Sequence, residues 1–167
     1  MPATPSDLFT FLDAQGIAFK TVTHPPLFTV EQSQALRGTI PGGHTKNLFL
    51  KDKKGAVFLV VAPEDAKIDL KSLHHRLGAA RLSFGSERLL AELLGVAPGS
   101  VTPFAAINDT DRKVTVVLDA GLMQHRLVNC HPLVNTMTTT IATEDLKRFL
   151  LATGHNPQIA VVASAED

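Results

Sequence analysis

Apolar residues recur every three or four positions in five segments, which is the spacing of amphipathic helices. Each segment follows a residue whose side chain can accept a hydrogen bond from the free backbone amides of a helix start. The expected N-caps are Thr4, Thr29, Asp69, Ser86 and Thr143, and the expected helices run to Gly16, Leu36, Gly78, Gly95 and Ala152. The second helix is short and rests on a capping box that Thr29 forms with Gln32.

Short apolar runs, alternating or continuous, predict the strands. We expect strands over residues 17–23, 45–51, 56–62, 81–84, 104–107, 114–118, 126–128, 134–141 and 159–162. The turn D-K-K-G at 52–55 joins the second and third strands as a hairpin. Because strands and helices follow no regular β-α-β alternation, the pattern predicts an α+β fold with a mixed, largely antiparallel, barrel-like sheet. No linker or repeat divides the chain, so we expect a single domain over residues 1–167.

Composition narrows the functional classes. The chain has 167 residues with sixteen basic and sixteen acidic side chains, so global charge predicts neither nucleic-acid nor membrane binding. The single cysteine, Cys130, excludes an internal disulfide and fits a reducing cytoplasm. No apolar run approaches the ~20 residues of a membrane-spanning helix, and the N-terminus lacks the pattern of a signal peptide. The absence of tryptophan and tyrosine argues against binding a single strand by extended stacking.

The segment G-G-H-T-K-N-L-F-L, from Gly42 to Leu50, is the first candidate for chemistry. Two glycines permit a tight or left-handed backbone before a strand. Lys46 and Asn47 fall where the loop becomes that strand, and together an ammonium and a carboxamide can hold an anionic oxygen and a carbonyl or water. Neighbours on a strand point to opposite faces unless the backbone bends. The alternative is a solvated lysine beside a turn-forming asparagine.

Two further segments suit a polar cleft. The loop L-G-V-A-P-G-S-V-T-P contains Gly95, Pro98 and Gly99 and follows a helix, so its backbone amides can bind a carbonyl or phosphate oxygen. It can equally be an ordinary helix end. The segment C-H-P-L-V-N-T-M-T-T-T places His131 before a proline, which favours an extended backbone. A lone histidine is more often structural than catalytic, and Cys130 is more often a buried apolar residue than a nucleophile.

No motif predicts a metal or a cofactor. The histidines have no H-x-x-x-H spacing, there is no C-x-x-C pair, and no phosphate-binding glycine motif is present. We therefore expect neither a metal site nor a cofactor.

Taken together, the candidate segments resemble the bacterial YbaK/ProX-type aminoacyl-tRNA editing family. The resemblance rests on an ordered set of motifs that covers nearly the whole chain: H-P-P-L-F-T-V-E-Q at His24, K-N-L-F-L at Lys46, L-G-V-A-P-G-S-V-T-P-F at Leu94, I-N-D at Ile107 and H-P-L-V-N-T-M-T at His131. This family includes the editing domain inserted in bacterial prolyl-tRNA synthetases and its freestanding homologues. The chain is most similar to the freestanding branch that removes alanine from mischarged tRNA(Pro).

The resemblance implies a trans-editing hydrolase with a barrel-like sheet flanked by helices. By this similarity Lys46 binds the ribose and phosphate of the terminal adenosine, and Asn47 holds the aminoacyl group or the attacking water. Gly95, Pro98 and Gly99 shape the loop that positions the ester carbonyl, and His131 lines the aminoacyl pocket. The implied partners are the acceptor end of tRNA(Pro) and prolyl-tRNA synthetase, and the implied location is the cytoplasm.

Three alternatives stay open at this point. A relative in the superfamily removes cysteine from the same tRNA, serine is a further possible substrate, and a protein could keep the fold as a non-catalytic tRNA-binding or synthetase-binding module. Local charge fits contact with an acceptor stem despite the zero net charge. The candidate contacts lie on the predicted hairpin and the following helix: Lys51, Lys53, Lys54, Lys71 and Arg76. An ordinary solvated surface would show the same charges.

Overall fold

The computed structural model describes residues 1–26 and 40–163, so the short helix expected after Thr29 lies outside the described residues. The other four predicted helices are confirmed. They are α1 (Pro5–Ala14), α3 (Leu70–Leu77), α4 (Glu87–Leu94) and α5 (Thr143–Ala152), with short 3-10 helices η1 (Pro98–Ser100), η2 (Pro103–Asn108) and η3 (Leu122–Gln124). In this part of the chain no helix is long and apolar enough to cross a membrane.

Three of the predicted caps are confirmed, and one is wrong. Thr4, Asp69 and Ser86 each accept a backbone amide hydrogen in the first turn of their helix. The N-cap of α5 is Ala142, and Thr143 is the first helical residue. The Thr143 hydroxyl donates to the carbonyl of His125 instead, so a contact distant in sequence takes up the group that was expected to cap the helix.

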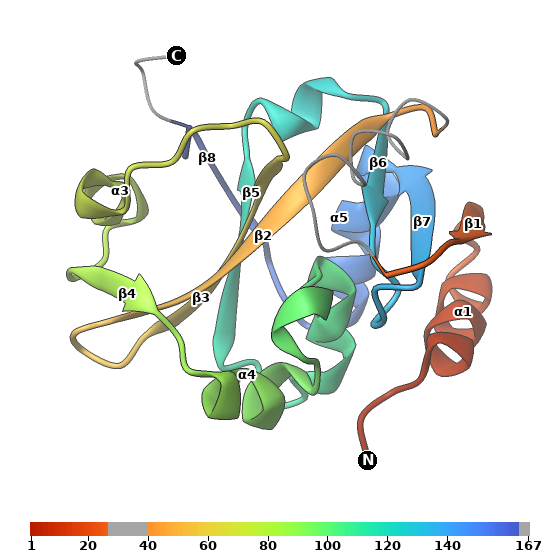
Figure 1. The fold of residues 1–167 in the computed structure, drawn as a ribbon, viewed down its shortest axis with the longest axis horizontal. Coiled ribbons are helices and arrows are strands. Elements are labelled where there is room, and N and C mark those ends of the chain that lie inside the picture. The colour runs from red at the N-terminus through yellow and green to blue at the C-terminus, as the bar shows by residue number, and fades with distance from the viewer. Residues whose placement is uncertain (27–39, 164–167) are drawn as a thin grey trace.

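In the described residues eight strands form one mixed sheet (Figure 1). They are β1 (Phe19–Thr23), β2 (Gly43–Asp52), β3 (Val57–Pro63), β4 (Leu82–Phe84), β5 (Val114–Asp119), β6 (Leu127–Cys130), β7 (Met137–Ala142) and β8 (Gln158–Ala160). The strand order is β1-β7-β6-β2-β3-β5-β8, with β4 paired to β2. The pairs β1–β7, β6–β7, β2–β3 and β2–β4 are antiparallel, whereas β2–β6, β3–β5 and β5–β8 are parallel. The predicted mixed sheet flanked by helices is thus confirmed.

The strand predicted over residues 104–107 is wrong, because this segment is the 3-10 helix η2. Thr102 begins it by accepting the amide hydrogen of Phe104, and Pro103 supplies a backbone angle suited to a helical first turn. Phe104, Ala105 and Ala106 are all buried, and a short apolar run that is buried on every side does not distinguish a strand from a helix.

The strand predicted from Val134 begins later, at Met137. Residues 131–136 form a loop, in which Leu133 has a φ of 73° and its amide donates to the carbonyl of His131 at 3.0 Å. The turn is unusual for a leucine, because positive φ is rare outside glycine and asparagine. This loop contains the predicted site residue His131.

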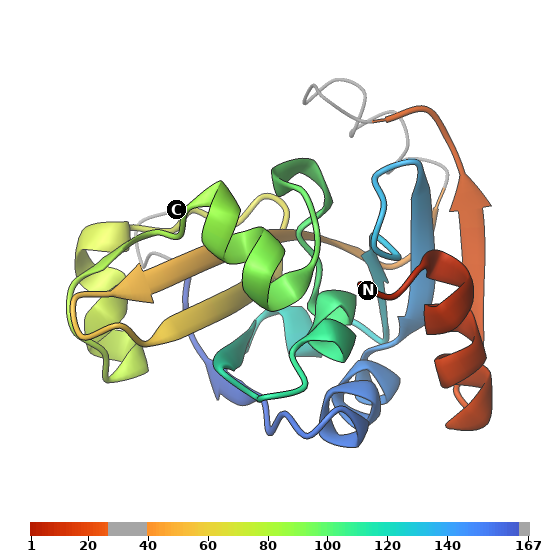
Figure 2. The ribbon, with the colours of Figure 1, turned by 90° about the horizontal axis from the view of Figure 1, so that it is seen from below.

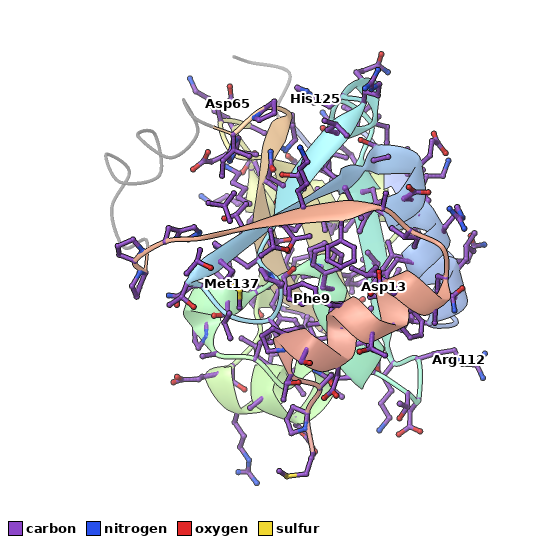
Figure 3. The ribbon with its side chains drawn as sticks, turned by 90° about the vertical axis from the view of Figure 1, so that its right-hand side faces the viewer. Phe9, Asp13, Asp65, Arg112, His125 and Met137 are labelled. Atoms are coloured by element: carbon purple, nitrogen blue, oxygen red, sulfur yellow. The ribbon has the colours of Figure 1, made fainter. Side chains whose placement is uncertain are left out.

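The sheet has a buried cluster on each face. The larger cluster joins the sheet to α1, α4, η2 and α5, which contribute Leu8, Leu94, Phe104 and Phe149 among others. Phe9 of α1, labelled in Figure 3, stacks on Phe19 of β1, with ring centroids 5.1 Å apart. A smaller cluster lies under α3, which Figure 2 shows well apart from α1 and α5.

Strand β2 links these two halves of the molecule and crosses it diagonally in Figure 1. One edge pairs with β3 along Thr45–Lys51. The other edge pairs with β6 only at Gly43 and His44, and with β4 only from Leu50 onward. Between these two partners the edge of β2 has a break in its pairing, which we call the β2 break (residues 45–48).

Candidate active site

The β2 break directs backbone groups of Asn47 away from β3. The backbone carbonyl of Phe49 accepts the amide hydrogen of Gly85 at 2.9 Å, and the amide of Lys53 donates to the backbone carbonyl of Arg81 at 3.1 Å. Odd-numbered residues of β2 therefore direct their backbone groups toward β4. Because this direction repeats every second residue, the amide and carbonyl of Asn47 point to the same edge, just beyond the end of β4.

A cavity of about 230 Å³ opens at the β2 break. Its lining comes from β2, the end of β4, α4 and the η1 region: Asn47, Leu48, Phe49, Phe84, Gly85, Glu87, Leu90, Pro98 and Val101. The Oδ1 atom of Asn47 is buried and has no hydrogen-bond partner among the described residues. A buried acceptor without a partner costs about 1–3 kcal/mol, so it marks a position where a ligand donor would be favourable. The structure thus brings Asn47 and Pro98 together at one cavity.

Lys46 lies on the other face of β2 and does not line this cavity. Alternation places it on the side of Leu48 and Leu50, which pack with the smaller cluster. Its ammonium donates a hydrogen bond to the carbonyl of Ala66, in the segment that follows β3. The glycine-rich entry therefore does not bend the strand enough to bring the two neighbouring side chains to one face.

His131 is half-buried beside His24, with the two ring centroids 6.3 Å apart. Its Nδ1 lies 2.9 Å from the carbonyl oxygen of Met137, and a carbonyl can only accept, so Nδ1 carries the proton. Burial lowers the pKa of His131, the positive form of His24 lowers it further, and the Met137 hydrogen bond and Glu64 oppose the shift. The ring is therefore neutral near pH 7, with Nε2 as an acceptor.

The loop 131–136 links His131 to the η1 region. A side chain built at Gly99 would place its Cβ 3.3 Å from Nδ2 of Asn135, so the absence of a side chain at Gly99 permits this close approach. Asn135 was not predicted as a site residue from the sequence, although it lies inside the motif H-P-L-V-N-T-M-T. His24 was likewise part of a motif without an assigned role.

Gly95 is placed differently from Pro98 and Gly99. It ends α4 with a φ of 65°, a left-handed conformation that glycine adopts without strain. A Cβ there would lie 2.9 Å from Asn108 and from Pro2, so the position also admits close packing of the N-terminal segment. Gly95 lines a hollow formed with residues of that segment and does not line the cavity at Asn47.

Cys130 is unsuited to nucleophilic catalysis in this setting. The side chain is buried, and burial raises the pKa of its thiol to about 12, although a hydrogen bond from Thr45 opposes the shift. The thiolate, which is the reactive form, is therefore scarce at neutral pH. Cys130 is instead a small buried residue that packs in the larger cluster.

The basic residues expected to contact RNA lie on the hairpin of β2 and β3 and on α3. Lys51, Lys53 and Lys54 are exposed, and the turn between the strands is held by Asp52, which accepts three backbone amide hydrogens. Lys71 is exposed at the start of α3. Arg76 is exposed too, but its guanidinium donates to the carbonyls of residues 161 and 163 near the end of the described chain.

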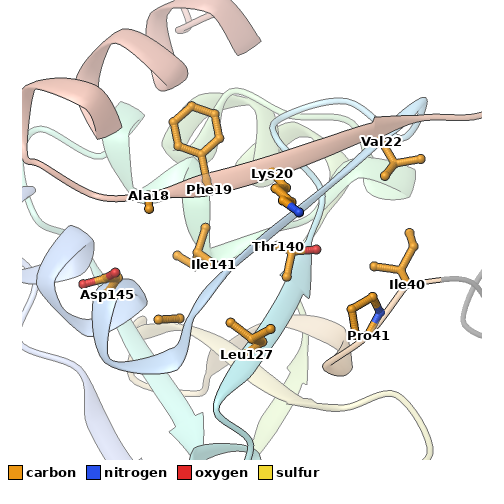
Figure 4. Close-up of a pocket in the computed structure, with 11 residues that line it drawn as sticks. Ala18, Phe19, Lys20, Val22, Ile40, Pro41, Leu127, Thr140, Ile141 and Asp145 are labelled. Carbon is orange, nitrogen blue, oxygen red and sulfur yellow. The ribbon is translucent and has the colours of Figure 1, made fainter.

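A second cavity, of about 480 Å³, lies beneath β1 and β7 (Figure 4). Its lining is mostly apolar, and Lys20 and Asp145 are its charged members. It adjoins residue 40, where the described chain resumes, and it shares none of the candidate site residues. Among the described residues, no group of three or more histidine, cysteine, aspartate or glutamate side chains could hold a metal ion.

Comparison with known proteins identifies the family. The family model described as the aminoacyl-tRNA editing domain matches residues 24–149, so the chain belongs to that family. A relative from Danio rerio, called prolyl-tRNA synthetase associated domain-containing protein 1, is 45% identical over 92% of this chain and 84% of its own length. The prolyl-tRNA editing protein ProX of Acetoanaerobium sticklandii is 38% identical over 86% of this chain and 88% of its own.

A solved structure supports the fold. A crystal structure of a protein proposed to be a trans-editing enzyme for prolyl-tRNA synthetase superimposes with a TM-score of 0.74, covering 99% of this chain and all of that one. Sequence identity in this pair is only 20%, so the likeness concerns the fold alone.

Proposed function

We propose that this protein is a trans-editing deacylase that hydrolyses the ester of mischarged tRNA(Pro), with alanine as the favoured aminoacyl group. The observation that carries the proposal is the cavity at the β2 break in a chain of the aminoacyl-tRNA editing family. There the buried Oδ1 of Asn47 has no hydrogen-bond partner in the part of the chain that the structure describes. The name of the Acetoanaerobium sticklandii relative, a prolyl-tRNA editing protein, supports the choice of tRNA.

In the proposed reaction a water oxygen attacks the ester carbonyl carbon, and the bond from that carbon to the ribose oxygen breaks. The proton lost by the water ends on the ribose oxygen, so the products are a free amino acid and an uncharged tRNA. An aminoacyl ester is already activated, and placement of the water with stabilisation of the developing negative charge suffices for catalysis. The proposal needs no covalent nucleophile, in line with the raised pKa of Cys130.

Each candidate residue has a place in this scheme. Asn47 holds the aminoacyl group or the attacking water through its unpartnered oxygen, and the η1 loop with Pro98 and Gly99 positions the carbonyl. Lys46, on the other face of the strand, binds the ribose and phosphate of the terminal adenosine after leaving the carbonyl of Ala66. His131 lines the aminoacyl pocket as a neutral ring.

The residues offer no obvious general base other than His131, so we propose that the substrate takes part. The free ribose hydroxyl beside the ester can orient or deprotonate the water, while the protein supplies placement and charge. Exposed lysines on the β2–β3 hairpin and on α3 give the acceptor stem a basic surface. The proposed location is the cytoplasm, and prolyl-tRNA synthetase is a proposed partner.

A deacylation panel tests the proposal. Purified protein is incubated with tRNA(Pro) carrying alanine, cysteine, serine or proline, and with tRNA(Ala) carrying alanine. Fastest release from Ala-tRNA(Pro) is expected. Faster release of cysteine would instead identify a Cys-tRNA(Pro) deacylase, and no turnover on any substrate would favour a non-catalytic tRNA-binding or synthetase-binding module.

A further inference from the structure

Phe84, the last residue of β4, is an aromatic side chain that the fold leaves in solvent. Phe84 is 60% exposed. The other exposed large apolar side chains of the described residues are aliphatic or methionine. A single exposed apolar residue is common in folded proteins and carries no argument alone. Two neighbouring features make this one informative: the cavity that it lines and the charges around it.

Phe84 lies at the rim of the cavity that contains Asn47. Its Cα is paired with that of Leu50 across β2 and β4, and the next residue, Gly85, donates its amide hydrogen to the carbonyl of Phe49. A Cβ at Gly85 would lie only 2.5 Å from the Phe49 ring, so only a glycine lets β4 come this close. The backbone therefore holds the Phe84 ring at a defined place beside the candidate site.

Exposed cations lie on the elements next to Phe84. Arg81, immediately before β4, and Lys51 of β2 are exposed, and Arg88 is exposed in the first turns of α4, which follows β4 in Figure 1. Because Lys51 is paired with Ser83, it projects from the face of the strands opposite to Phe84. Glu87 is the carboxylate in this group; it lies at the start of α4, where the helix dipole favours a negative charge. An exposed flat ring at the rim of the cavity that contains the buried Asn47 oxygen, with cations on the neighbouring elements, suits stacking on a nucleobase of the proposed tRNA substrate.

We propose that Phe84 is a positioning residue that stacks against one unpaired base near the 3′ end of the tRNA and so places the ester at Asn47. This inference rests on the proposed deacylase function. Every nucleobase has a π face, so one phenylalanine ring suffices to hold a single base without reading its identity. The stacked base fixes the end of the strand, and the basic residues nearby contact its phosphates.

A spectroscopic test uses the absence of tryptophan and tyrosine from the chain. In Phe84→Trp the new indole is the only such fluorophore, and stacking on a base should quench its emission. The probes are uncharged tRNA(Pro) and the same tRNA without its unpaired 3′ nucleotides. Quenching by the intact tRNA alone is expected, and Leu151→Trp, an exposed position on α5, should not respond to either. Equal quenching by both tRNAs, or none by the intact one, would overturn the proposal.

A kinetic test separates binding from chemistry. Phe84→Ala and Phe84→Leu should raise KM for Ala-tRNA(Pro) by about 5- to 150-fold, the range expected for loss of one stacked base, with kcat changed by less than about twofold. Phe84→Tyr should keep KM near that of the wild type, because the ring is retained. Circular dichroism of each variant checks the fold.

The outcomes distinguish the two proposals. A wild-type protein that turns over Ala-tRNA(Pro), with unchanged KM in Phe84→Ala, would refute the stacking role and leave the deacylase function intact. A wild-type protein without turnover would refute the deacylase function itself. Unchanged tRNA binding but weaker binding to purified prolyl-tRNA synthetase in Phe84→Ala would show that the ring contacts a protein, which also overturns the stacking role.

Discussion

The Nδ1 atom of His131 lies 2.9 Å from the carbonyl oxygen of Met137, and this contact determines which ring nitrogen carries the proton. Since the carbonyl only accepts, the proton is on Nδ1 and Nε2 has a free lone pair. Burial then keeps the ring neutral by lowering its pKa from the usual 6.5. A neutral acceptor is thus held in the loop that approaches Gly99 through Asn135.

This arrangement predicts a pH dependence. Because the pKa of His131 is lowered, its neutral form persists below pH 6.5, and kcat/KM for Ala-tRNA(Pro) should fall only at pH values lower than that. His131→Gln should lower activity and remove this acidic limb, whereas His125→Ala, at an exposed position, should leave the profile unchanged. A limb centred above pH 6.5, or one that persists in His131→Gln, would contradict the assignment.

Lys46 provides a test of electrostatic placement. Replacement by alanine removes the ammonium that we assign to the terminal nucleotide and should lower kcat/KM by about a hundredfold or more, as for other single charge-stabilising groups. Lys67→Ala is the matched control, because Lys67 is exposed in the neighbouring segment that Lys46 contacts through Ala66. Steady-state deacylation with circular dichroism measures the effect. Equal activity of the two variants would show that Lys46 is not part of the active site.

The part played by the substrate can be tested without changing the protein. A misacylated tRNA(Pro) ending in 2′-deoxyadenosine lacks the hydroxyl that we assign to orienting or deprotonating the water. It should bind with nearly normal affinity yet resist hydrolysis. Binding is measured by filter retention and hydrolysis by release of labelled amino acid. Rapid hydrolysis of the deoxy substrate would refute substrate assistance and direct the search for a base to His131.

The basic hairpin predicts a salt dependence of tRNA binding. Each phosphate contact contributes a slope of roughly −0.7 to −0.9 to a plot of log affinity against log salt concentration. Replacement of Lys51, Lys53 and Lys54 by alanine should weaken binding and flatten this slope. The double replacement of Lys20 on β1 and Lys147 on α5, away from the hairpin, should leave it unchanged. A triple variant with the wild-type slope would show that the hairpin faces away from the tRNA.

The helices of this chain were predictable because their signals are local. Thr4, Asp69 and Ser86 each begin a helix in the next residue, and the cap, the apolar spacing and the final glycine lie within one or two turns. Phe104 shows the limit of this reasoning. Its segment is buried on all sides, so no periodicity separated the observed 3-10 helix from the expected strand.

The candidate site was predictable only in its components. Asn47 and Pro98 were named from separate motifs, and the structure brings them to one cavity. The break in the pairing of β2, by contrast, depends on where β4 and β6 end, which is set by contacts distant in sequence. Phe84 was missed for the same reason, since nothing near it in the sequence indicates that the ring stays in solvent beside Asn47.

The most direct test of the account is the ratio of two hydrolysis rates on the same tRNA. An editing enzyme must spare Pro-tRNA(Pro). Contacts with one or two methylenes in an apolar pocket change binding by only ~1–3 kcal/mol, so the pocket must also exclude the larger proline by size. We predict that kcat/KM for Ala-tRNA(Pro) exceeds that for Pro-tRNA(Pro) by at least about a hundredfold, the upper end of that range. Comparable rates on the two substrates would contradict the editing function.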